Sequence, residues 1–114
     1  MTTREKIQTI AKALDDKKAE NIVALDVYGL TILSDCFLLA TGNNAPQLKA
    51  MADAVEEKMA EAGQTPIDVE GYQSAKWILM DFGDVCVHMF DAETREFYNL
   101  EKIWGDAPKI DLNL

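Results

Sequence analysis

Residues Trp77 to Phe90 read W-I-L-M-D-F-G-D-V-C-V-H-M-F, two six-residue runs joined by Gly83-Asp84. A glycine in the first position of a two-residue connection is typical of the type II′ turn that closes β-hairpins. Folding the stretch about this turn places Leu79 opposite His88 and likewise fixes all the other cross-strand pairs of the two runs. The stretch therefore predicts a β-hairpin of fixed register.

The two faces of this hairpin differ in character, because side chains alternate across a strand. One face is apolar throughout and is expected to pack into the core; it carries Ile78, Met80, Phe82, Val85, Val87 and Met89. The other face is mixed; it carries Trp77, Leu79, Asp81, Cys86, His88 and Phe90. Aromatic side chains beside a carboxylate and the only histidine are typical of a contact surface. The same pattern also fits a face covered by a second helical layer, with His88 and Asp81 as satisfied core polar groups.

Length and composition favour one globular domain over residues 1–114. A chain of 114 residues that is 48% hydrophobic has enough apolar side chains for a single core. It has no apolar run of about 18 residues, so we expect no membrane span. Its N-terminus, M-T-T-R-E-K-I, lacks the apolar core of an export signal, which favours a cytoplasmic location. Cys36 and Cys86 lie in apolar runs without metal-site spacing and are predicted to be buried, reduced thiols.

The formal net charge of −9 limits the kinds of partner that this chain can bind. Nucleic-acid binding requires clustered lysine and arginine side chains that neutralise phosphates. The 11 basic residues here are scattered, with no basic stripe. Direct binding to nucleic acid or to an anionic membrane is therefore disfavoured, whereas a basic protein partner suits this charge.

The remaining elements predict a two-layer α/β (α+β) domain in the order α-β-β-α-β-β-β-α. Apolar periodicity predicts helices over 3–15, 45–62 and 91–98, the second capped by Asn44 and closed by Gly63. Nearly continuous apolar runs predict strands at 22–27 and 36–41, and 64–71 suits a short edge strand. We expect a mixed sheet of about five strands with helices mainly on one face, the mixed hairpin face left open, and a loose tail at 109–114.

Four motifs in the right order give this chain a specific resemblance. They are D-C-F-L-L-A-T-G-N at 35–43, E-G-Y-Q-S-A-K-W at 70–77, D-F-G-D-V-C-V-H-M-F at 81–90 and R-E-F-Y-N-L-E-K-I-W-G-D-A at 95–107. Together they closely resemble the ribosomal silencing factor family, called RsfS or Iojap-like, from the first helix to Pro108. Cys36 stands where that family often has tyrosine, and Cys86 where it usually has valine or isoleucine. Both replacements stay apolar and affect only local packing.

The resemblance implies a nucleotidyltransferase-like fold that is not catalytic and needs no cofactor. Family members bind the large ribosomal subunit at its protein number fourteen, block joining of the small subunit and repress translation when nutrients are short. By motif position, the resemblance implies that the contact residues are Trp77, Leu79, Asp81, His88, Tyr98, Leu100, Glu101 and Trp104. Trp77 and Trp104 would be desolvated anchors, and Asp81 and Glu101 would pair with basic side chains of the partner. Trp104 fits equally well as a core plug that locks the C-terminal segment.

Two alternatives remain open from the sequence. A nucleotidyltransferase would need carboxylates that converge on Mg²⁺ and a loop that holds phosphate, for which Asp81, Asp84 and the Gly42 loop are the candidates. They form no D-x-D pair, and the Gly42 loop lacks serine and basic residues. Cys86 and His88, two residues apart, have no identifiable oxyanion donors. Alternatively, the open face could pair with itself in a homodimer away from the ribosome.

Overall fold

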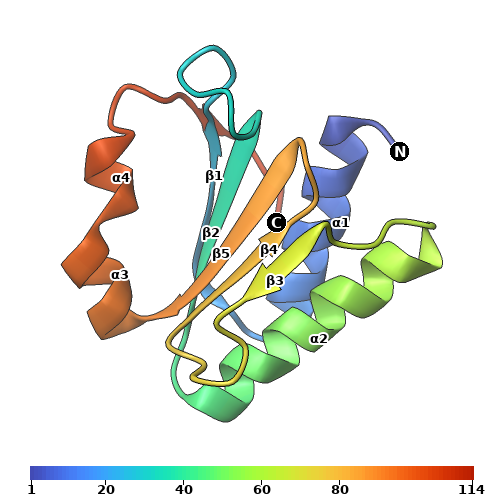
Figure 1. Cartoon of the computed structure of the whole chain (residues 1–114), viewed down its shortest axis with the longest axis vertical. Helices are drawn as coiled ribbons and strands as arrows, with labels where there is room; N and C mark the ends of the chain where they lie inside the picture. Colours follow the sequence, from blue (N-terminus) through green and yellow to red (C-terminus); the bar gives the residue numbers. More distant parts are fainter.

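The computed structural model describes residues 1–114 and contains one six-stranded mixed sheet with helices on both sides (Figure 1). The strands lie in the order β3-β4-β5-β2-β1-β6. Their bounds are β1 Glu20–Asp26, β2 Cys36–Gly42, β3 Asp68–Glu70, β4 Trp77–Asp81, β5 Val85–Asp91 and β6 Lys109–Ile110. The helices are α1 Thr3–Asp16, α2 Ala45–Glu61, α3 Ala92–Tyr98 and α4 Leu100–Ile103. No helix is both long enough and apolar enough to cross a lipid bilayer.

The hairpin forms with the predicted register. Strands β4 and β5 pair antiparallel, with Leu79 opposite His88 and Trp77 opposite Phe90. The turn depends on Gly83, whose φ of +89° lies in the left-handed region that side chains with a Cβ rarely adopt. On its other edge β5 pairs with β2, the one parallel pair in the sheet. The hairpin therefore lies inside the sheet, with only the short β3 outside β4.

The apolar face of the hairpin packs beneath α1 and α2, as predicted. Ile78, Met80, Val87 and Met89 are fully buried there, within a cluster of 22 buried side chains. Each of these helices begins at a side chain that caps it. Thr2 forms a capping box with Glu5, and the Asn44 side chain accepts a hydrogen bond from the backbone N–H of Gln47. The two long helices therefore cover one face of the sheet.

The opposite face is not open, which corrects the prediction for its central part. Helices α3 and α4 lie on this side (Figure 1) and, with the segment after them, cover the middle of the sheet. The result is a second, smaller core, whose buried members are Leu25, Val27, Phe37, Leu39, Cys86, Phe90 and Ala107. Cys36 belongs to the first core and Cys86 to the second, so the two thiols lie on opposite faces and do not pair.

The predicted loose tail at 109–114 is also wrong. Lys109 and Ile110 form β6, which pairs with β1, and the N–H of Asp26 donates to the carbonyl of Pro108 at 2.8 Å. Leu112 is buried in the main core. The tail satisfies backbone groups that would otherwise be unpaired along the edge of β1. The sheet consequently has six strands rather than about five.

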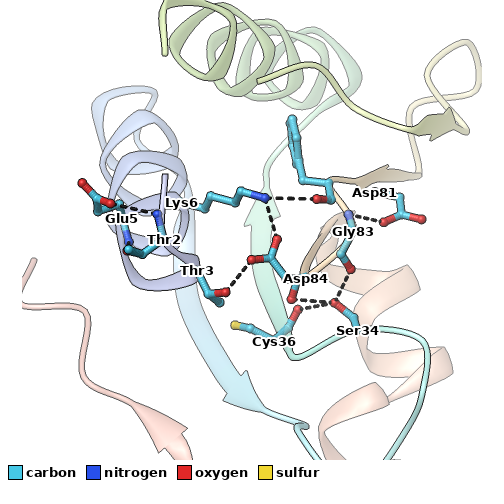
Figure 2. A network of polar contacts seen from close by, with 10 residues as sticks. Thr2, Thr3, Glu5, Lys6, Ser34, Cys36, Asp81, Gly83 and Asp84 are labelled. Carbon is cyan, nitrogen blue, oxygen red and sulfur yellow. Dashed lines mark hydrogen bonds and ion pairs between the residues drawn. The ribbon is translucent and has the colours of Figure 1, made fainter. Parts of the chain in front are cut away.

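A polar network fixes the hairpin turn to α1 and to the β1–β2 loop (Figure 2). The Asp84 carboxylate accepts hydrogen bonds from Lys6 Nζ, at 2.7 Å, and from the Thr3 hydroxyl. The Asp84 carbonyl oxygen accepts the N–H groups of Asp35 and Cys36 and lies 2.9 Å from Ser34 Oγ. Three segments that are distant in sequence are therefore joined at one turn.

Burial raises the pKa of Asp84, but the hydrogen bonds from Lys6 and Thr3 and the Lys6 charge outweigh it and lower the pKa below its ordinary value. The folded state therefore binds the Asp84 proton less tightly than the unfolded chain does. The stabilisation is complete above the unfolded-state pKa of about 4 and is lost as the pH falls through the lower, folded-state pKa.

We predict that Asp84→Asn lowers the free energy of unfolding by about 1 to 2 kcal/mol at pH 7, because Lys6 and Thr3 lose a charged acceptor. Urea unfolding at several pH values measures this, and the difference from wild type should shrink as the pH falls below about 4. Asp106→Asn is the control, since it removes the same charge from an exposed loop. Equal stability of the two variants at pH 7 would contradict the prediction.

Candidate protein-docking surface

Three aromatic side chains form a partly exposed patch at the start of β4. Trp77 is half-buried and packs against Tyr98, with ring centroids 4.8 Å apart. Tyr98 is 48% exposed and meets Phe97 edge-on at 5.0 Å, and Phe97 is 79% exposed. We call Trp77, Phe97 and Tyr98 the aromatic patch. The sequence-based prediction included Trp77 and Tyr98 but missed Phe97.

Three carboxylates lie along the same face, at the edge formed by β3 and β4. Asp68 pairs with Asp81, and Glu70 pairs with Leu79, so their side chains share the face of Asp81 and Leu79. None of the three forms an ion pair within the chain, although Asp81 accepts the N–H of Gly83 at 2.8 Å. We call Asp68, Glu70 and Asp81 the acidic row. Directly opposed like charges destabilise a sheet, and a cationic partner would relieve that repulsion.

His88 does not lie on an exposed face, contrary to the prediction. Its side chain is 6% exposed and lies among Phe37, Trp77 and Phe90. Burial lowers the pKa of His88 to about 4, so the imidazole is neutral at pH 7. Its Nδ1 accepts a hydrogen bond from Trp77 Nε1 at 3.2 Å, whereas Nε2 is buried without a partner. His88 therefore lies behind the aromatic patch.

Leu79, Leu100 and Trp104 are half-buried and pack against the second core. Trp104 meets the ring of Phe37 edge-on at 5.5 Å, which favours its role as a core plug. Glu101 already has a cation of its own chain, because Arg95 Nε donates to it at 2.9 Å. That hydrogen bond lowers the pKa of Glu101 below its ordinary value despite partial burial. Of the eight predicted contact residues, Trp77, Asp81 and Tyr98 present the most suitable groups at the surface.

The residues considered for catalysis do not converge. Gly42 pairs with Asp91 through β5, whereas Asp81 pairs with Cys86, five residues away along the same strand. At about 3.3 Å per residue this separates the Gly42 loop from Asp81 by roughly 16 Å. Burial, and next the charges of Asp81 and Glu70, raise the pKa of the Cys86 thiol to about 12, so it stays protonated beside His88.

The match to known proteins extends over the entire chain. Residues 1–114 match the family described as "Ribosomal silencing factor during starvation". The chain belongs to this family. It is 44% identical to the ribosomal silencing factor RsfS of Halalkalibacterium halodurans, covering 98% of this chain and 96% of the relative. It is 42% identical to RsfS of Bacillus subtilis, covering 99% and 96%. A crystal structure of a Chromobacterium violaceum protein superposes with a TM-score of 0.90 at 38% identity, covering 92% of this chain and 88% of that one.

The resemblance drawn from the four motifs is thus confirmed, and with it the fold class. Within this RsfS-family chain, Arg95 joins the segment that carries Tyr98 to the sheet. Besides Glu101, it donates from Nη1 to the carbonyl of Asn21 at 2.7 Å and to the hydroxyl of Thr41 at 2.8 Å. Arg95 borders a polar hollow of about 590 Å³ between α3 and the start of β1. Because these intrachain acceptors already engage its guanidinium, the hollow is a poor phosphate site.

We predict that Arg95→Met loosens α3 and α4, because Thr41, Asn21 and Glu101 lose their shared donor. Unfolding free energy should fall by about 2 kcal/mol, the range for hydrogen bonds to a mostly buried charged group. Hydrogen exchange should become faster in residues 95–104 than in β2 and β5. Lys102→Met is the control, because it removes an exposed charge of the same segment that forms no ion pair within the chain. An equal increase of the hydrogen-exchange rate in all parts of the chain would contradict the proposed local role of Arg95.

Proposed function

We propose that this protein binds the large ribosomal subunit through its protein number fourteen, prevents joining of the small subunit and represses translation under nutrient limitation. The observation that carries this proposal is the aromatic patch beside the unpaired acidic row. Large aromatic side chains dominate the energetics of protein interfaces, and unpaired carboxylates select a basic partner. Membership of the ribosomal silencing factor family supports the ribosome as the assembly concerned.

Electrostatics favour a protein contact over an RNA contact. A net charge of −9 repels phosphate, and the acidic row adds three negative side chains on the proposed surface. Ribosomal proteins that hold RNA carry basic side chains, so one of them offers the complementary charge. The protein would therefore reach the ribosome through a protein and obstruct the small subunit by its bulk. A regulatory role in the cytoplasm, without catalysis, follows from this proposal.

The decisive experiment is sedimentation of purified ribosomal subunits under joining conditions, with and without this protein. The proposal requires that it travels with the large subunit and that joined ribosomes decrease. Direct binding to the isolated protein number fourteen, measured by titration, then tests the named partner. If the protein stays at the top of the gradient and joining is unchanged, the proposed function is wrong.

We predict that Trp77→Ala and Asp81→Lys each weaken binding to the large subunit at least about tenfold. Loss of a central aromatic anchor typically costs about 2 kcal/mol, and charge reversal slows association in a salt-dependent manner. Glu57→Lys is the matched charge control, because Glu57 is exposed on α2, on the opposite side of the sheet. Folded variants that bind like wild type would contradict the placement of the surface.

A further inference from the structure

His88 is a buried histidine, only 6% exposed, that lies behind the proposed surface. We propose that His88 is a positioning residue, which holds the indole of Trp77 in the orientation that docks the ribosomal partner. This inference rests on the proposed function and assigns His88 a role different from direct contact. The two ring nitrogens of His88 differ, because one has a hydrogen-bond partner and the other has none.

The hydrogen bond fixes the tautomer of His88. An indole N–H is only a donor, so Nδ1 of His88 must carry the lone pair that accepts from Trp77 Nε1 at 3.2 Å. The proton of the neutral ring then lies on Nε2. That nitrogen is inaccessible to solvent and has no acceptor. The single polar contact of the imidazole is therefore the one with Trp77.

The surroundings of His88 suit an apolar ring better than an imidazole. Phe90 stacks nearly parallel to it, with an interplanar angle of 11°, and Phe37 meets it edge-on at 5.1 Å. A buried N–H without an acceptor destabilises the folded state, a penalty that a phenylalanine here would avoid. What the imidazole adds beyond a phenyl ring is the acceptor at Nδ1. The benefit of the imidazole must therefore lie in its effect on the orientation of Trp77.

Trp77 needs such an acceptor because packing alone holds only part of its ring. The indole is half-buried and lies at the start of β4. Its ring centroid is 5.2 Å from that of Phe90 and 4.8 Å from that of Tyr98. The bond to His88 fixes which edge of the indole faces the protein and which faces outward. An aromatic side chain that is already oriented loses less conformational freedom on docking, which strengthens binding.

The test is His88→Phe, which keeps an aromatic ring at this position and removes the acceptor atom Nδ1. We expect an unfolding midpoint equal to or above that of wild type, because the unpaired N–H is gone. We expect affinity for the purified large subunit to fall at least about fivefold through lost preorganisation. In ¹⁵N-correlated NMR spectra, the indole N–H of Trp77 should shift and exchange faster with solvent, while that of Trp104 should not.

Cys86→Val is the matched control, since Cys86 is buried two residues away on the same face of β5, whereas the indole N–H donates to His88. It should leave affinity and the Trp77 signal unchanged. A fall in the His88→Phe midpoint would show a folding role instead and overturn the inference. Equal affinity of wild type and His88→Phe would overturn it while leaving the proposed function intact.

Wild-type protein provides a test that needs no variant. The Trp77 indole N–H should exchange with solvent more slowly than a free indole does, and exchange at the free rate would show that the bond to His88 is absent. If wild type itself does not bind the large subunit, the proposed function and this inference fail together. Failure of the inference alone is distinguished from this result by a wild type that binds and a His88→Phe variant that binds equally well.

Discussion

The parallel pairing of β2 with β5 is the constraint on which the rest of the structure depends. Seven residue pairs hold these strands together, from Cys36 with Val85 to Gly42 with Asp91. At their ends the chain leaves on opposite sides of the sheet: β2 continues into α2, and β5 into α3 (Figure 1). Parallel strands require cover on both faces, and these two helices begin that cover. Because α2 has 17 residues and α3 only 7, the cover is unequal.

This inequality explains where the candidate surface lies. The face beneath α1 and α2 is sealed by long apolar stripes, and the apolar side chains of β2, β4 and β5 on that face are buried. The other face is sealed over β1, β2 and β5 by α4 and the following segment, but towards β3 and β4 the cover ends. Trp77 and Asp81 lie at that margin and remain half-exposed. A partly covered sheet thus supplies both a rigid base and accessible side chains.

The features that the sequence predicts well are local ones. The Gly83 turn determines the register of the hairpin, and Thr2, Asn44 and Asp91 cap helices that start where expected. The features that it misses depend on contacts between distant segments. Nothing in the composition of 109–114 shows that an unpaired edge of β1 is available to it. The burial of His88 likewise requires the helices after residue 91 to fold back over the sheet.

The residues of the candidate site likewise fall into some that the sequence predicts and others that depend on contacts between distant segments. The motifs direct attention to Trp77, Tyr98 and Asp81, which the structure brings to one face. The sequence does not predict the place of Asp68 and Glu70, because alternation in 64–71 does not show which face they share until the pairing of β3 with β4 is known. Motif position predicts that Glu101 pairs with a partner, whereas Arg95 engages it within the chain.

Three features of this face are unfavourable for folding alone. The one buried side-chain nitrogen or oxygen without a hydrogen-bond partner is Nε2 of His88. The directly opposed carboxylates of Asp68 and Asp81 lie on the same side, and Phe97 is largely exposed next to Tyr98. A chain shaped by stability alone would have little reason to keep these groups. A partner that brings cations to the acidic row and apolar surface to the aromatic patch would offset two of the three penalties. The remaining penalty, the unpaired Nε2 of His88, persists in the complex, because it accompanies the hydrogen bond that orients Trp77.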